Sequence, residues 1–247
     1  MMYRLYQRLT QLVLMLSLCC ATLVQANVII IGTRIIYPSN QKTVNVQLNN
    51  ENKLPALVQS WIDNGDPNVA PEQVKTPFVI TPPVTRVEAN KGQTLRITYT
   101  GEPLPNDRET VFYFNLLDIP PKPTAEQQAE HPNYLQIAFR SRIKLFFRPV
   151  ELNMSVNDSY NKVQFRLNNE KGKSVIVVNN PTPYYMSYLS IDVQQGGNKA
   201  SAKDIDMVAP FSQTTYVLSR PLKGQATVTW SLLNDYGGVL KGVSQTQ

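Results

Sequence analysis

Few side chains in this 247-residue sequence have the types and spacing that catalysis requires. The one histidine, His131, stands before Pro132 in a polar segment, where a histidine is more often solvated than catalytic. Asp107 and Glu109 are spaced so that folding could pair their carboxylates as in a glycosidase, but this spacing is common. The sequence has no Gly-x-Ser-x-Gly elbow, phosphate-binding loop or His-Glu-x-x-His pattern. A hydrolase therefore remains an alternative that lacks a visible catalytic constellation.

The N-terminal segment has the three parts of a secretory signal peptide. Arg4 and Arg8 supply a basic start, residues 12–18 form an apolar run, and Val24-Gln25-Ala26 offers a cleavage site. A transmembrane anchor is the rival interpretation, but the apolar run is short and no stop-transfer pattern follows it. We therefore expect residues 1–26 to be removed from an exported protein that begins at Asn27.

Composition narrows the class of the exported protein. Cys19 and Cys20 both lie in the predicted signal peptide, so the remaining 221 residues (247 minus 26) have no thiol for disulfides, cysteine catalysis or thiolate metal sites. Their net charge is +4, because the whole chain has +6 and the signal peptide removes Arg4 and Arg8. This mild basic balance fits a solvated surface, and no basic run interleaved with aromatic residues points to nucleic acid. No pattern indicates a metal or a cofactor.

The longest strand pattern of the sequence runs from Asn133 to Pro149. Apolar and polar side chains alternate there over about eleven residues, roughly twice the usual strand length, so we expect part of the strand to extend past its own sheet. The apolar positions are Leu135, Ile137, Phe139, Ile143 and Leu145. The polar positions of opposite parity include Gln136, Arg140, Arg142 and Lys144.

Short alternating or β-branched runs separated by Pro, Asn and Gly fill the rest of the chain and predict strands. Six precede the long strand, at residues 28–37, 44–48, 56–62, 77–80, 95–99 and 111–117. Six follow it, at residues 163–167, 174–178, 184–191, 205–208, 213–218 and 226–233. Helical signals are nearly absent, and residues 124–130 are interpreted as a loop with one turn. The pattern predicts an all-β protein with two immunoglobulin-like sandwiches, residues 27–148 and 149–247, joined by a short hinge that keeps a cleft between them.

Five motifs, in this order, resemble those of the periplasmic pilus-assembly chaperones of the chaperone/usher pathway. They are Thr33-Arg34, the runs at residues 104–120 and 143–149, Asn180-Pro181-Thr182-Pro183-Tyr184-Tyr185, and Asn234-Asp235-Tyr236-Gly237-Gly238. The resemblance covers essentially all of residues 27–247. It implies two domains in a boomerang arrangement, a periplasmic location, no enzymatic activity and no cofactor. Its implied partners are pilus subunits and an outer-membrane usher.

The resemblance also implies how a subunit is held. Arg34 and Lys144 match two basic residues that anchor the subunit's C-terminal carboxylate in the cleft, a role that suits a bidentate guanidinium and a compact ammonium. Leu135, Ile137 and Phe139 match side chains that fill the groove of a subunit whose own fold lacks a strand, a known form of strand addition. Without these motifs, ordinary surface charges and core side chains would be the simpler interpretations.

Two further sets of residues receive roles from the same resemblance. The interdomain salt bridge is assigned to Glu109, Arg148 and Asp235. The patch facing the usher is assigned to Leu57, Ile119 and Pro120, although core packing and turn formation explain these three nearly as well.

Several points stay open at this stage. In a straight strand Lys144 faces away from Leu135 and Ile137, so strand twist or a bulge near residues 140–142 is needed to reconcile their roles. Residues 121–133 lack cysteine and resemble the loop of the short-loop branch, which serves rod-forming pili, but they form a longer loop. Self-association that caps the exposed strand is also open. A pilus subunit or surface adhesin is the structural rival, which the two full strand sets disfavour.

Overall fold

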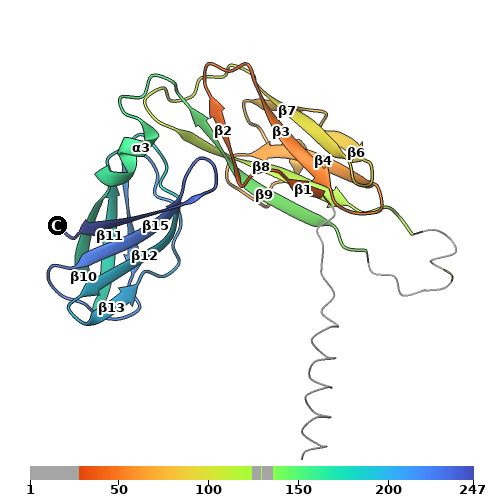
Figure 1. Cartoon of the computed structure of the whole chain (residues 1–247). Coiled ribbons are helices and arrows are strands. Elements are labelled where there is room, and N and C mark those ends of the chain that lie inside the picture. The colour runs from red at the N-terminus through yellow and green to blue at the C-terminus, as the bar shows by residue number, and fades with distance from the viewer. Residues whose placement is uncertain (1–27, 124–128, 130–135) are drawn as a thin grey trace, which may run out of the picture.

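The computed structural model describes residues 28–123, 129 and 136–247. Regular structure in these residues is almost entirely β, and the strands form four sheets that pack as two sandwiches. Figure 1 shows the sandwiches as two elongated lobes that meet at an angle. The predicted fold class, all-β with two immunoglobulin-like sandwiches in a boomerang arrangement, is therefore confirmed. The predicted signal peptide lies outside the described residues.

The first sandwich packs a four-stranded sheet against a five-stranded sheet. The order β1-β3-β7-β5 comprises β1 (Val28–Ile30), β3 (Thr43–Asn50), β7 (Gly92–Tyr99) and β5 (Phe78–Thr81). The order β2-β9-β8-β4-β6 comprises β2 (Arg34–Pro38), β9 (Phe139–Arg148), β8 (Thr110–Ile119), β4 (Ala56–Asp63) and β6 (Val84–Val87). A short 3-10 helix, η1, covers Pro71–Gln73. Alternate side chains of both sheets, among them Tyr37, Leu95, Phe114 and Leu145, are buried in one core.

The second sandwich begins after a helical turn formed by α3 (Val156–Ser159) and η2 (Tyr160–Lys162). One sheet has the order β10-β11-β14, with β10 (Gln164–Glu170), β11 (Lys173–Asn180) and β14 (Ser212–Val217). The other has the order β13-β12-β15-β16, with β13 (Asn198–Ser201), β12 (Tyr188–Gln195), β15 (Thr227–Leu233) and β16 (Val239–Gln245). Side chains such as Phe165, Ile176, Met186 and Trp230 fill a second, separate core. Among the described residues, no helix is long and apolar enough to cross a membrane.

Two strand predictions were wrong. The run at residues 28–37 is not one strand, because the chain turns at Gly32, whose φ of 119° favours glycine. Consequently β1 pairs with β3 in one sheet, whereas β2 pairs with β9 in the other. Residues 205–208 contribute only an isolated bridge between Val208 and Met186. The prediction also missed three short or edge strands and the turn of α3, which Ser155 caps by accepting a hydrogen bond from Asp158 N–H. The missed strands are β6, β13 and β16.

The long strand is shorter than predicted, because β9 begins at Phe139 and residues 136–138 before it are not in a strand. Residues 133–135 of the predicted strand lie outside the described residues. The register of β9 itself is regular. Each residue of β9 from Phe139 to Phe147 lies opposite one residue of β8, so this ladder contains no bulge near residues 140–142. Lys144 therefore remains on the face opposite to Phe139. The inner half of β9 places Leu145 and Phe147 in the core, whereas Phe139 at its start is exposed.

Candidate functional site

The two basic residues predicted to act together lie side by side. Strand β2 runs parallel to β9, and the register pairs Arg34 directly with Lys144. The Arg34 guanidinium lies over the Phe146 ring, 5.8 Å from its centroid, and donates a hydrogen bond from Nη1 to the Leu233 carbonyl of the second domain at 3.1 Å. Arg34 therefore stands at the junction of the two lobes.

Burial makes this pair of charges electrostatically unusual. It is the main cause that lowers the pKa of Arg34 and the pKa of Lys144, and the neighbouring Arg34 charge lowers the pKa of Lys144 further. Asp206 Oδ1 of the second domain lies 3.7 Å from Lys144 Nζ. Within the described part of the chain, Arg34 Nε is buried without a hydrogen-bond partner. We call the junction formed by Arg34, Lys144, Leu233 and Asp206 the cleft. The two adjacent, partly desolvated cations favour an anion there.

The three residues predicted to link the domains do meet. Arg148, the last residue of β9, donates from Nε to Glu109 Oε1 at 2.7 Å. Its Nη1 and Nη2 donate to both oxygens of Asp235 on the β15–β16 turn, at 2.7 and 2.8 Å. Glu109 Oε2 accepts the backbone N–H of Tyr185 at 2.8 Å. Burial raises the pKa of Glu109, whereas Arg148 and the Tyr185 N–H oppose that shift because they favour the carboxylate.

Aromatic contacts extend this junction. Phe146 is buried on the outer face of β9, where its ring packs against that of Tyr185 with centroids 5.6 Å apart. On the other side, the Arg108 guanidinium lies 4.9 Å from the centroid of the Phe211 ring in the second domain. These contacts and the ion pairs join the same two lobes, so several independent interactions act on their relative angle.

The outer half of β9 has a free edge. Strand β2 pairs only with residues from Lys144 to Arg148, so among the described residues no strand pairs with Phe139–Ile143 on the side away from β8. Ile137 and Phe139 are 51% and 40% exposed. Leu135, the third predicted donor residue, lies outside the described residues. An unpaired edge with exposed apolar side chains can accept a strand from another chain.

A polar cluster that the sequence analysis did not assign holds this part of β9 to its sheet. Arg142 donates from Nε and Nη2 to both oxygens of buried Asp63 on β4, at 2.9 and 2.6 Å. Asn115 of β8 donates to Asp63 Oδ2 at 2.8 Å, and Arg140 donates to Asn115 Oδ1 at 3.0 and 2.8 Å. Arg140 also lies over the Trp61 ring, 4.9 Å from its centroid. The sequence feature that could have predicted this cluster is the pair Arg140 and Arg142, which occupy alternate positions on one face of β9.

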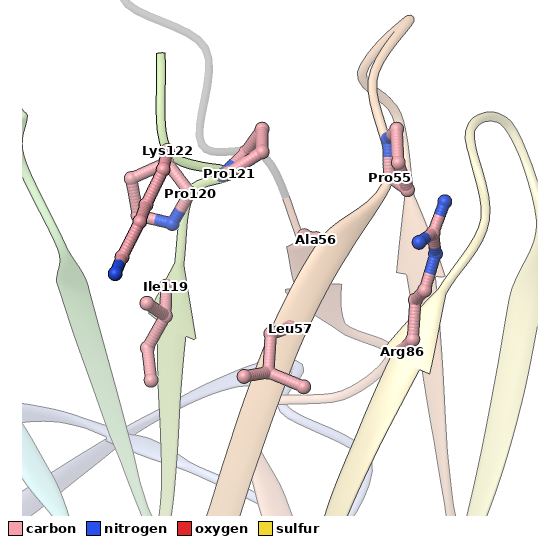
Figure 2. Close-up of a pocket in the computed structure, with 8 residues that line it drawn as sticks. All are labelled: Pro55, Ala56, Leu57, Arg86, Ile119, Pro120, Pro121 and Lys122. Carbon is pink, nitrogen blue, oxygen red and sulfur yellow. The ribbon is translucent and has the colours of Figure 1, made fainter. Parts of the chain in front are cut away.

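The residues predicted to face the usher line one pocket at the other end of β8. Leu57 and Ile119 lie opposite each other in the β4–β8 pair, and Pro120 follows Ile119. Figure 2 shows these side chains together with those of Arg86 and Lys122, which line the same pocket. The pocket has a volume of about 340 Å³. Leu57 is 44% exposed, so it is not a core residue. In the described part of the chain, no three His, Cys, Asp or Glu side chains gather as metal ligands would.

Comparison with known proteins identifies the family. Residues 27–153 match the model of the pili and flagellar-assembly chaperone, PapD N-terminal domain, and residues 158–244 match that of the pili assembly chaperone PapD, C-terminal domain. The chain therefore belongs to the PapD-like pilus-assembly chaperones. Chaperone protein HifB of Haemophilus influenzae is 54% identical over 90% of this chain and 89% of its own. The probable fimbrial chaperone YadV of Escherichia coli K12 is 44% identical over 88% and 89% of the two chains.

Solved structures agree with this assignment. The crystal structure of the YadV chaperone has a TM-score of 0.75 and 39% identity, and the match covers 89% of this chain and all of that one. The SafB chaperone of Salmonella enterica, solved in complex with the SafA pilin, has a TM-score of 0.71 and 27% identity over 91% and 97% of the two chains. This protein is accordingly a chaperone of pilus subunits and not an enzyme.

Proposed function

We propose that this chaperone works in the periplasm, where it adds the edge of β9 to a fimbrial subunit and delivers that subunit to an outer-membrane usher. The observation that carries the proposal is the free edge of Phe139–Ile143, which lies directly beside the paired cations Arg34 and Lys144. The solved complex of the related SafB chaperone with a pilin supports a subunit as the ligand. The N-terminal signal pattern supports export.

The geometry suggests how the two features cooperate. A subunit strand that ends with its carboxylate at Arg34 and Lys144 would have its register along β9 fixed by charge-assisted hydrogen bonds. From Lys144 to Phe139 the edge comprises six residues, whose five steps of rise cover about 17 Å over which main-chain hydrogen bonds can form. The basic anchor residues and the apolar side chains need not lie on the same face of the sheet. An added strand lies in the plane of the sheet beside β9, so it can reach residues on both faces.

The apolar side chain at the start of β9 and the two that precede this strand in the sequence would then supply the missing part of the subunit's core. Each fully buried side chain of this size contributes about 1.5–3 kcal/mol, so Leu135, Ile137 and Phe139 together could stabilise an incomplete fold. We further propose that the domains divide at residues 148 and 149 and that Glu109, Arg148 and Asp235 fix the angle between them. The loop before β9 supports the short-loop branch, for rod-forming pili, only in its lack of cysteine.

The usher is proposed to bind the pocket of Leu57, Ile119 and Pro120. This pocket lies at the end of β8 remote from Glu109 and the cation pair, and it is close to the start of β9, where Asp118 pairs with Phe139 and Gln136 Nε2 donates to the Pro120 carbonyl. The usher would therefore bind near the residues proposed to enter the subunit. The apolar lining of the pocket, with its basic residues, suits an apolar side chain of a partner that also carries acidic groups.

Co-expression with a pilin-like subunit in the periplasm tests the subunit-binding proposal. Wild type should yield a stable one-to-one complex, whereas Arg34→Ala and Lys144→Ala should stay folded and soluble but lose most of the complex. Lys91→Ala, which removes a positive charge at an exposed turn far from the cleft, is the matched control. Normal subunit levels with both cleft variants would contradict the anchoring role.

A further inference from the structure

One acidic side chain of the second domain reaches the cation pair. Asp206 lies in the segment between β13 and β14, and its Oδ1 is 3.7 Å from Lys144 Nζ. The side chain of Asp206 is 80% exposed, so this pairing is loose and open to water. Nevertheless it places a carboxylate where a ligand carboxylate is proposed to bind.

The backbone around Asp206 is firmly held. The hydroxyl of buried Tyr216 donates to the Asp206 carbonyl at 2.6 Å, and the N–H of Met207 donates to Asp206 Oδ1 at 2.7 Å. Val208 exchanges two hydrogen bonds with Met186, which is fully buried in the second core. The position of the Asp206 carboxylate is therefore set by the core of the second domain.

The side chain of Asp206 carries the same chemical group as a ligand carboxylate, so the two would compete for the ammonium of Lys144. Both favour the charged form of Lys144, and Asp206 already opposes the effect of burial and of Arg34 on the pKa of that lysine. A second carboxylate brought to Lys144 must either displace Asp206 or meet its negative charge. Arg142 also acts on Lys144, and Tyr113 lies opposite it on β8. The titratable groups that act on the adjacent Arg34 are Asp235, Tyr160, Glu109 and Arg148.

We propose that Asp206 is a specificity-determining residue, an internal counter-ion that a ligand carboxylate must displace from Lys144. Carboxylates that bring no strand are then held poorly, whereas a subunit terminus gains hydrogen bonds along β9 that compensate for the displacement. The inference rests on the proposed anchoring of a subunit carboxylate by Arg34 and Lys144.

Binding of two synthetic peptides tests this inference. Both carry the C-terminal sequence of a pilin-like subunit, one with a free carboxylate and one with a terminal amide. Asp206→Asn should bind the carboxylate peptide about two- to fivefold more tightly than wild type, the effect expected from an exposed ion pair, and should bind the amide unchanged. Asp204→Asn is the matched control, because it removes the same charge from the same segment.

The outcomes separate this inference from the proposal on which it rests. If wild type prefers the carboxylate peptide and Lys144→Ala does not, the anchor stands. Equal or weaker carboxylate binding by Asp206→Asn would then overturn the role of Asp206 alone, and so would an equal gain for both peptides or the same gain in Asp204→Asn. If wild type shows no preference for the carboxylate, the anchor itself fails, and the counter-ion role fails with it.

Discussion

The cleft holds positive charge that the protein itself neutralises only in part. Burial is the main reason why the pKa values of Arg34 and Lys144 are lowered, so the charged forms of both side chains are less stable here than in water. An anion bound between them would raise both pKa values, because it favours the charged forms. Because protonation and anion binding favour each other, the same attraction increases the affinity of the site for the anion. Under the proposed anchoring role, the unfavourable burial of the two charges in the free chaperone would be relieved when a carboxylate binds, which would favour that ligand.

Ile119 offers a test of the usher pocket that leaves this cleft untouched. Its side chain lines the pocket at the end of β8 remote from the cations, and its replacement by Asp puts a charge where an apolar partner group is proposed to bind. We expect Ile119→Asp to keep the one-to-one subunit complex but to reduce capture by the purified usher at least tenfold. Val79→Asp, at an exposed apolar position of β5, is the control. Equal capture of both variants would remove the pocket from the usher interface.

Strand β9 is the element on which the proposed function depends, and its two halves differ. The inner half is paired on both sides, with β8 and with β2, whereas the outer half is paired with β8 alone. Such a one-sided strand needs other interactions to stay extended. The bidentate contact of Arg142 with Asp63, together with Asn115, supplies them from the outer face of the sheet.

Removal of the Asp63 charge should therefore destabilise the first domain. We expect Asp63→Asn to lower the free energy of unfolding by about 3 kcal/mol, the low end of the range for breaking a buried ion pair, because Arg142 keeps contact with water. Urea unfolding at neutral pH measures this difference. Asp107→Asn, which breaks the exposed pair with Arg108, is the control and should change stability by less than about 1 kcal/mol.

Acidification should reproduce the effect in the wild type. Burial alone would raise the pKa of Asp63, but hydrogen bonds from Arg142, Asn115 and the Gly65 N–H lower it overall. A carboxyl group with a lowered pKa contributes stability above its unfolded pKa of about 3.9, and that stability is lost as the pH falls through the folded value. The stability difference between wild type and Asp63→Asn should accordingly shrink below about pH 4. A difference that stays constant down to pH 2 would contradict this role for the carboxylate.

The strands were predictable where burial imposed alternation on the sequence. The runs of β4 and β8 show it, because each strand is paired on both sides and buries mostly alternate residues. Strand β11 was predictable for another reason, since its β-branched run is buried continuously from Ser174 to Val178. Edge strands such as β13 and β16 bury few side chains and left no such signal. The break at Gly32 was not predicted, because the chain passes there from one sheet to the other, and local residue propensities do not indicate which sheet a strand joins. The meeting of Arg34 with Lys144 followed only from the family motifs, whereas Asp206 and Asp63 required the fold itself.

The two lobes have separate cores, so the angle between them depends on their junction. Arg148 is central there, because it is the last residue of β9 and binds Glu109 on its own domain and Asp235 on the other. Two further contacts cross the same cleft, from Arg34 to the Leu233 carbonyl and from Lys144 to Asp206. A change in the angle would therefore change the geometry of the proposed carboxylate site itself.

Arg148→Met tests how far the ion pairs fix this angle. The change keeps much of the side-chain volume but leaves the buried Glu109 carboxylate without its cation, so we expect the interdomain distance distribution to broaden while both sandwiches stay folded. Spin labels at Lys91→Cys and Lys223→Cys, one in each domain, measure this distribution, because residues 27–247 contain no other cysteine. Arg166→Met, on the exposed face of β10, serves as the control. If the distribution stays as narrow as in wild type, the remaining contacts between the domains, such as the packing of Phe146 on Tyr185 and of Arg108 on Phe211, would be sufficient to set the angle. The loss of subunit binding expected on opening the cleft should then also be absent.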